Sequence, residues 1–273
     1  MPTILDQIVA HKRQEVADRK TIVPVKLLER SLYFPSQPVS LRKYVQRDDL
    51  NGIIAEFKRR SPSKGMLNAY APVERTTIGY MQAGASALSV LTDSAFFGGK
   101  SEDLTTARKF NFCPILRKDF VIDEYQILEA KSIGADAILL IAAILTKEEV
   151  AQLGQFAHSL GLEVLLEVHD RAELERTVTP HVDLIGVNNR NLHDFTLSVE
   201  TSKELADLIP DDFVKVSESG ISSAETIMEL RQYGFEGFLI GETFMKNSRP
   251  EKACAAFIGE LKKLRTASPA FTI

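Results

Sequence analysis

The feature that most constrains the fold of this chain is an alternation of short apolar runs with longer amphipathic stretches. Eight runs rich in Ile, Val and Leu follow residue 50, and each has the length of a β-strand. They cover residues 52–58, 86–92, 114–119, 136–142, 162–168, 183–189, 213–219 and 237–242. The stretches between them repeat apolar residues at helical spacing, and several end in glycine, as helices commonly do. The sequence therefore predicts a series of β-then-α units.

Eight such units in roughly 225 residues match the size and repeat of a (β/α)8 barrel. The runs are apolar almost throughout, which is typical of parallel strands buried on both faces. An open, doubly wound sheet is the alternative fold, but no Gly-x-Gly-x-x-Gly turn follows the first run. We therefore predict an α/β protein with the fold of a TIM barrel.

The first fifty residues have a different pattern. Apolar residues between positions 4 and 16 recur at helical spacing among polar ones, which predicts a leading helix. Two shorter helices are expected over 25–31 and 41–46. No Gly/Ser-rich linker divides the rest of the chain. We interpret residues 1–48 as an N-terminal helical extension and residues 49–273 as one barrel domain that carries the catalytic site.

Composition narrows the range of functions. The chain of 273 residues has 33 basic and 37 acidic side chains and a net charge of −4, which argues against a nucleic-acid partner. Its two cysteines, Cys113 and Cys254, are too few for a disulfide framework and suit a reducing compartment. The longest apolar stretch, residues 137–145, is far shorter than the roughly 20 residues that span a bilayer, and no secretory signal precedes it. We expect a cytoplasmic protein without a membrane partner.

Polar side chains stand at the C-terminal ends of several predicted strands, where a barrel of this kind builds its active site. Glu56 and Lys58 lie two positions apart and therefore share one strand face. The other candidates are Lys118, Glu167, Asn188, Glu218 and Ser219. A salt bridge that only stabilises the barrel is the alternative for each residue alone. Together, two lysines and three carboxylates predict one cavity with both an acid and a base, whose protonation states stay open.

Two glycine-containing turns and one basic loop indicate an anionic substrate. Gly220 and Gly241 follow the last two predicted strands and precede helices, where backbone N–H groups bind phosphate in many barrels. Ordinary tight turns are the alternative role of these glycines. The loop over residues 59–70 contains Arg59, Arg60 and Lys64, and it predicts either a mobile basic lid for a phosphorylated, carboxylated substrate or a solvated surface loop.

The histidines predict no metal site. His169 lies two positions after Glu167 on the same strand face, so we expect it to support that carboxylate rather than transfer protons. The other four are expected to be surface or structural residues: His11, His158, His181 and His193. No pair of histidines, and neither cysteine, has the spacing of metal ligands.

Six ordered motifs then carry a family resemblance. IIAEFKRRSPSKG, PILRKDFVIDEYQI, LLEVHD, IGVNNRNL, SESGI and LIGETFM occur in the order typical of indole-3-glycerol-phosphate synthases, which the chain resembles from the first strand to the last. The family is known as a TIM barrel with a similar helical extension. The resemblance implies conversion of 1-(2-carboxyphenylamino)-1-deoxyribulose 5-phosphate to indole-3-glycerol phosphate, carbon dioxide and water. It implies no cofactor and no metal, and a monofunctional enzyme is expected, as a monomer.

The resemblance also implies roles for individual residues. The catalytic group would be Glu56, Lys58, Lys118, Glu167, Asn188 and Ser219. Substrate binding would involve Ser61, Arg190 and Glu218, and the phosphate would lie at Gly220, Gly241 and Glu242. Some relatives have serine or alanine at the position of Glu242. Because a carboxylate repels phosphate, we expect the Glu242 side chain to turn away while its backbone N–H contributes.

The expected chemistry leaves some assignments open. We expect Lys118 to be the acid for ring closure and Glu167 the base for the later dehydration, although the two lysines could exchange roles. Phe120 and Leu139 either flank the aromatic ring or belong to the core. The alternative functions are phosphoribosylanthranilate isomerase, a Schiff-base aldolase using Lys118, and a non-catalytic barrel that only binds phosphate.

Overall fold

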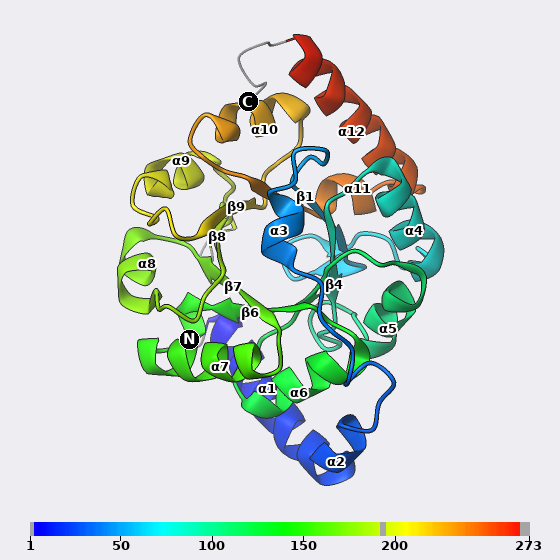
Figure 1. The fold of residues 1–273 in the computed structure, drawn as a ribbon, viewed down its shortest axis with the longest axis vertical. Helices are drawn as coiled ribbons and strands as arrows, with labels where there is room; N and C mark the ends of the chain where they lie inside the picture. Colours follow the sequence, from blue (N-terminus) through cyan, green and yellow to red (C-terminus); the bar gives the residue numbers. More distant parts are fainter. Residues whose placement is uncertain (1–2, 192–194, 268–273) are drawn as a thin grey trace.

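The computed structural model describes residues 3–191 and 195–267 and contains a closed barrel of eight parallel strands (Figure 1). The strands in chain order are β1 (Ile53–Phe57), β4 (Ala87–Leu91), β5 (Ile115–Lys118), β6 (Ala137–Ile141), β7 (Glu163–Val168), β8 (Leu184–Asn188), β9 (Val214–Glu218) and β10 (Gly237–Ile240). Each pairs with its neighbour in the chain, and β10 pairs with β1 to close the barrel. All eight predicted strands and the predicted fold are confirmed.

Helices cover the outside of the barrel (Figure 1). They are α4 (Val73–Ala83), α5 (Ser101–Phe110), α6 (Glu124–Ile133), α7 (Lys147–Ser159), α8 (Arg171–Thr177), α9 (Glu200–Ala206), α10 (Ala224–Arg231) and α12 (Pro250–Ala267), with a short α11 (Glu242–Met245) and a 3₁₀ turn (Ala142–Ile144). Gly84 and Gly134 end α4 and α6 with φ values of 100° and 92°, a backbone conformation that favours glycine. None of the described helices is long and apolar enough to cross a membrane.

Strand side chains alternate between two apolar layers. Ile53, Ala55 and Phe57 of β1 belong to the layer between strands and helices, whereas Ile54 points into the barrel interior with residues such as Leu165. This period of two also directs Glu56 inward, and with it every second residue near the strand ends. Polar side chains therefore meet where the interior opens.

The three N-terminal helices are α1 (Ile4–Ile22), α2 (Val25–Leu28) and α3 (Leu41–Val45), as predicted. Thr3 and Asp6 form a capping box that begins α1. Val45 of α3 packs close to Gly237, the first residue of β10, so α3 covers the N-terminal end of the barrel (Figure 1). Ile8 of α1 joins the same interior cluster from the opposite end. The extension thus contacts both ends of the barrel.

One local element differs from the expected loop. Within residues 59–70, β2 (Arg60–Ser61) pairs antiparallel with β3 (Gly65–Met66). The two strands are only two residues long, too short for a pattern of alternating apolar residues. The first βα-connection is therefore a small hairpin above the barrel.

Candidate active site

A cavity of about 180 Å³ opens at the C-terminal ends of the strands. The cavity is lined by all twelve residues to which the resemblance gives a catalytic, substrate-binding or phosphate-binding role: Glu56, Lys58, Ser61, Lys118, Glu167, Asn188, Arg190, Glu218, Ser219, Gly220, Gly241 and Glu242. They come from several strands and from the loops that follow them. The predicted convergence of two lysines and three carboxylates on one cavity is confirmed.

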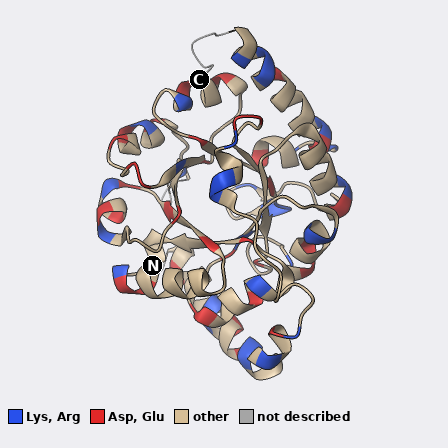
Figure 2. Ribbon diagram, in the orientation of Figure 1, with Lys and Arg blue, Asp and Glu red and all other residues tan. Residues whose placement is uncertain are grey.

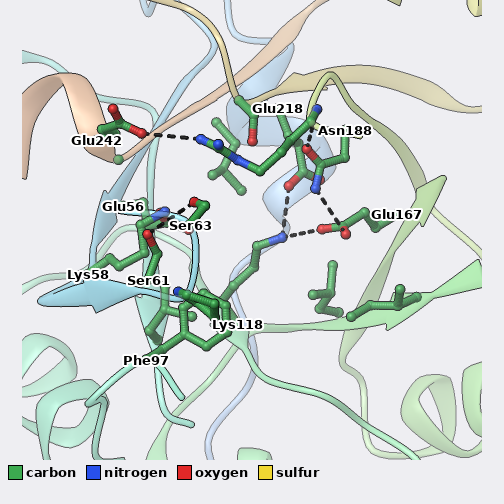
Figure 3. A pocket seen from close by; sticks show the side chains of 18 of the residues that line it. Glu56, Lys58, Ser61, Ser63, Phe97, Lys118, Glu167, Asn188, Glu218 and Glu242 are labelled. Atoms are coloured by element: carbon green, nitrogen blue, oxygen red, sulfur yellow. Dashed lines mark hydrogen bonds and ion pairs between the residues drawn. The ribbon is translucent and has the colours of Figure 1, made fainter. Parts of the chain in front are cut away.

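Lys118 lies at the centre of this cavity (Figure 3). Its Nζ donates to Glu167 Oε2 at 2.5 Å and to Glu218 Oε2 at 2.8 Å. Asn188 Nδ2 donates to the other oxygen of Glu167 at 3.2 Å. Both carboxylates are almost fully buried. Four side chains from four different strands thus form one hydrogen-bonded group.

The electrostatics of this group separate the two carboxylates. Burial would raise the pKa of Glu167, but Lys118 and then His169 outweigh it, so the pKa of Glu167 is lowered. Burial raises the pKa of Glu218 to about 7, although Lys118 opposes the shift. Burial would lower the pKa of Lys118, but Glu167 and Glu218 raise it. The result is an ammonium, one ionised carboxylate and one carboxyl group that titrates near neutral pH.

Two glycines provide the space for buried carboxylates. A Cβ at Gly241 would lie 2.2 Å from Glu56 Oε1, and one at Gly186 would lie 2.2 Å from Glu218 Oε1. Glu56 in turn pairs with Lys58 at 2.5 Å. Gly186 was not singled out from the sequence, because its neighbour Glu218 is on another strand. Gly241 therefore has a packing role beside any role at phosphate.

His169 supports Glu167, as expected. Its Nε2 lies 3.4 Å from Glu167 Oε1, and its Nδ1 lies 3.1 Å from Glu173 Oε2. The backbone N–H of His169 donates to the same Glu173 oxygen at 2.8 Å. Burial would lower the pKa of His169, but the two carboxylates raise it to about 10. The imidazolium is thus held between two acids.

The expected phosphate end has an unusual backbone and an unexpected ion pair. Ser219 and Gly220 have φ values of 66° and 75°, so the chain turns sharply as β9 ends. The Glu242 side chain does not turn away as expected. It lines the cavity (Figure 3). Its Oε2 lies 3.2 Å from Arg190 Nη2, and its Oε1 lies 3.6 Å from Lys64 Nζ. Two cations compensate this carboxylate, which explains why it stays at the site.

The expectation of a basic lid is only partly met. Arg59 pairs with Asp103 of α5, and Arg60 donates to the backbone carbonyls of Ala95 and Phe96. Lys64 alone of the three reaches toward the site, through its ion pair with Glu242. Arg59 is thus bound to α5 and Arg60 to the loop after β4, because a carboxylate and two carbonyl acceptors lie within their reach.

The apolar wall of the cavity includes residues that sequence reasoning missed. Phe120 and Leu139 line it as considered. Phe97 also lines it, with its ring centroid 5.8 Å from that of Phe120. From the extension, α1 contributes further lining residues: Ile4, Leu5 and Ile8. Helical spacing predicted α1, but no local signal indicates which surface its apolar face covers.

The remaining histidines lie away from the cavity. His11 packs edge-on against Phe96, and His158 pairs with Asp183 and contacts His181. His193 lies outside the described residues. Over residues 3–191 and 195–267, no group of three His, Cys, Asp or Glu side chains is arranged to hold a metal ion.

The fold and the site together define a class of protein: a (β/α)8-barrel enzyme whose cavity combines a lysine ammonium with carboxylates. The family model described as indole-3-glycerol phosphate synthase matches residues 5–257. The chain belongs to the indole-3-glycerol phosphate synthase family. As such it is a carboxy-lyase of tryptophan biosynthesis.

Individual relatives with the same name align with this chain over nearly their whole length. An indole-3-glycerol phosphate synthase from Bacteroides thetaiotaomicron is 49% identical over 258 residues, which cover 94% of this chain and 98% of the relative. A synthase of the same name from Burkholderia vietnamiensis is 42% identical and covers 93% of this chain and 98% of its own. Another, from Campylobacter hominis, is 41% identical and covers 95% of this chain and 99% of its own.

A solved structure supports the fold alone. The structure described as "Native KDPGal structure" has a TM-score of 0.56 and 13% sequence identity, and it covers 79% of this chain and 94% of its own. At this identity the likeness concerns the barrel and not its chemistry.

Proposed function

We propose that the enzyme converts 1-(2-carboxyphenylamino)-1-deoxyribulose 5-phosphate to indole-3-glycerol phosphate in this cavity. The substrate undergoes ring closure, then decarboxylation, then dehydration. The observation that carries the residue roles is Lys118, an ammonium held between Glu167 and Glu218 beside an aromatic wall. An acid and a base within one cavity are what the successive steps need.

Lys118 is the acid for ring closure. The ring carbon that bears the carboxylate attacks the ketone carbon, and the ketone oxygen takes a proton from the ammonium as the C–C bond forms. Loss of carbon dioxide then restores the aromatic benzene ring. Lys58, paired with Glu56 at 2.5 Å, holds the departing carboxylate or the phosphate. The two lysines line the same cavity, so the reverse assignment of their roles is the alternative.

Glu167 is the base for the last step, in which the intermediate loses water and a proton to become an indole. Its pKa is lowered by Lys118 and His169 against the effect of burial, so it is ionised before the reaction. Once Lys118 has given its proton to the ketone oxygen, the charge that lowers this pKa is gone, and Glu167 becomes the stronger base that the last step needs. Glu56 positions Lys58 and so assists the departing hydroxide, which takes a proton from the Lys58 ammonium and leaves as water. These roles use the two carboxylates on opposite sides of the cavity (Figure 3).

The remaining polar residues bind the flexible ribulose chain. Glu218 Oε1 is packed against Gly186, so the oxygen that would accept from a substrate hydroxyl is Oε2, beside the Lys118 ammonium. Asn188 and Ser61 line the same cavity and offer further hydrogen bonds. Such contacts hold the reacting carbons in a near-attack geometry.

The phosphate lies at the turns after β9 and β10. Backbone N–H groups near Gly220, Gly241 and Glu242, together with Ser219, are the proposed donors. Arg190 binds the substrate once it is released from Glu242. In the free enzyme the Glu242 carboxylate pairs with Arg190 and Lys64. When the substrate binds, its phosphate replaces the carboxylate as their partner.

The first test is turnover by the purified protein. Indole-product fluorescence should appear with the carboxyphenylamino substrate and not with phosphoribosylanthranilate, the substrate of the isomerase alternative. Borohydride treatment with substrate should trap no covalent adduct, whereas a Schiff-base aldolase would be trapped at Lys118. Absence of turnover with retained phosphate binding would favour the non-catalytic barrel.

We also propose that the enzyme works as a cytoplasmic monomer with no nucleic-acid or membrane partner. Both cysteines are buried free thiols, which suits a reducing compartment. Basic and acidic residues are interspersed along the outer helices in the view of Figure 2, and the net charge is −4. Sedimentation equilibrium tests the monomer.

The division into residues 1–48 and a catalytic barrel over 49–273 is part of the same proposal, and limited proteolysis tests it.

A further inference from the structure

Lys12 of α1 is a fully buried lysine that the proposed reaction does not use. Its Nζ lies 3.0 Å from Asp119 Oδ1, 3.1 Å from Asp93 Oδ2 and 3.1 Å from Glu15 Oε1. Its exposed fraction is 0%. Burying an ammonium is unfavourable unless carboxylates compensate it. Two of the three carboxylates belong to the barrel, so this residue joins α1 to the loops after β4 and β5.

Both aspartates also hold the backbone of a phenylalanine. Asp93 Oδ1 accepts the backbone N–H groups of Phe96 at 2.8 Å and Phe97 at 3.0 Å. Asp119 Oδ1 accepts the backbone N–H of Phe120 at 2.8 Å. Lys12 Nζ thus lies within 3.1 Å of one oxygen of each aspartate. In Asp119 this is the oxygen that also accepts the backbone N–H, whereas in Asp93 the other oxygen accepts the two N–H groups. Lys12 is therefore one interaction away from two aromatic residues of the cavity.

These two phenylalanines form part of the cavity wall. Phe97 and Phe120 both line it, with ring centroids 5.8 Å apart and ring planes at 41°. Ile8, one turn before Lys12 on the same helix, lines it as well. Asp119 directly follows Lys118 in the chain. The ion pairs of Lys12 therefore connect the helix, the aromatic wall and the strand that carries the proposed acid.

We propose that Lys12 is a positioning residue that fixes α1, Phe97 and Phe120 as one wall against the aromatic ring of the substrate. The proposal rests on the proposed function, because only that function places an anthranilate ring in the cavity. Lys12 touches no substrate atom in this account. It acts through Asp93 and Asp119, whose backbone contacts set where the two rings stand.

The charge balance explains why the link depends on a cation. Burial would lower the pKa of Lys12, but the surrounding carboxylates, Asp119 first, raise it, so the side chain is charged throughout the neutral range. An apolar residue at this position would leave Asp93 and Asp119 as neighbouring buried acids without their shared ammonium. Arg117 still bonds Asp119 at 3.2 Å, but no arginine of the described residues is paired with Asp93. We expect the loop that carries Phe97 to loosen most.

The test is Lys12→Met, with Lys12→Arg as the conservative variant and Lys20→Met as the matched control. Lys20 lies on the same helix and pairs with Asp123 at 2.7 Å, but it is about half exposed. For Lys12→Met, KM should rise about tenfold or more, equivalent to about 1.4 kcal/mol of binding, with kcat within about threefold of wild type. Lys12→Arg should recover most of this loss, and Lys20→Met should match wild type.

Ligand binding separates positioning from general loosening. In calorimetric titrations, the dissociation constant of indole-3-glycerol phosphate should be about tenfold larger for Lys12→Met than for wild type. The dissociation constant of inorganic phosphate should stay within about twofold of wild type. Equal losses for both probes, or unchanged binding and kinetics, would overturn the proposal. A fall in kcat at constant KM would also overturn it.

A second variant covers the case in which Lys12→Met does not fold. Asp93→Asn removes the charge that Lys12 binds but keeps an Oδ1 acceptor for the backbone of Phe97. It should raise KM about threefold or more with little change in kcat. An unchanged KM would overturn the proposal. Wild-type enzyme without turnover would instead contradict the proposed function, so the two failures are distinguishable.

Discussion

Lys118 is the lysine of the cavity that two carboxylates bind at once. Glu167 and Glu218 lie 49 and 100 residues further along the chain, yet both accept from the same ammonium. Their different environments make one an ionised carboxylate and give the other a pKa of about 7. A pair of acids whose pKa values are pushed apart is a frequent sign of separate acid and base roles.

The role of Lys118 can be tested by truncation. Lys118→Ala removes the proposed proton donor, so we expect kcat to fall by at least about a hundredfold, equivalent to about 2.7 kcal/mol of barrier, while product binding stays measurable. Lys203→Ala is the control, because Lys203 pairs with Glu200 and Glu229 on the outer helices. A kcat for Lys118→Ala within about threefold of wild type would assign the acid elsewhere, first to Lys58.

The pH dependence of stability tests the ion pairs of His169. Its pKa is raised from 6.5 to about 10 by Glu167 and Glu173 against the effect of burial, so the folded state binds the proton more tightly than the unfolded state. This contribution is fully present below about pH 6.5 and is lost as the pH rises through about 10.

We therefore expect His169→Gln to lower the free energy of unfolding by about 2 kcal/mol at pH 6 and by much less at pH 10. Urea denaturation at pH 6, 8 and 10 measures the difference. His158→Gln is the control, because the pair of His158 with Asp183 is about one-third exposed. A difference that stays constant from pH 6 to pH 10 would show that His169 is not held as an imidazolium.

At the scale of elements, local periodicity was sufficient for the strands and the N-terminal helices. Most barrel strands are short runs dominated by apolar residues, such as IIAEF in β1 and AILLI in β6, and α1 repeats apolar residues within its own sequence. The hairpin of β2 and β3 was not predictable, because strands of two residues have no period. The contacts of α1 were also not predictable, because Lys12 pairs with aspartates more than eighty positions away.

For Gly241, in the turn between β10 and α11, the structure and the sequence predict different effects of a larger side chain. From the sequence, a larger residue at Gly241 should obstruct phosphate and raise only KM. In the structure a Cβ there would lie 2.2 Å from Glu56 Oε1 and 2.9 Å from its Cδ. Gly241→Ala should therefore displace Glu56 from Lys58, so that kcat falls about tenfold or more and KM rises as well.

Steady-state kinetics with a melting curve checks this prediction. Gly259→Ala is the matched control, since a Cβ at Gly259 in α12 meets nothing within 4 Å. That variant should keep wild-type kinetics and gain up to about 1 kcal/mol of stability. A rise in KM for Gly241→Ala at unchanged kcat would return Gly241 to a phosphate role alone.

At the scale of the whole molecule, the barrel explains why so much of the site was accessible from sequence. Parallel strands in a closed barrel bring all their C-terminal ends together, so polar residues at those positions converge although they are far apart in the chain. Which of them pair was not accessible, because Lys118 meets carboxylates of β7 and β9, which do not neighbour β5, and Glu242 meets Lys64 of the hairpin loop. The extension adds contacts at both ends of the barrel through Ile8 and Val45.

The most direct test of the account follows the fate of the substrate carboxylate. With ¹³C in the anthranilate carboxyl group, the wild-type protein should release one labelled carbon dioxide for each indole-3-glycerol phosphate formed, and Lys118→Ala should release neither at a comparable rate. The coupling is required because ring closure at the carboxylate-bearing carbon precedes decarboxylation in the proposed sequence. Label retained in a rearranged phosphorylated product, or carbon dioxide released without an indole, would contradict it.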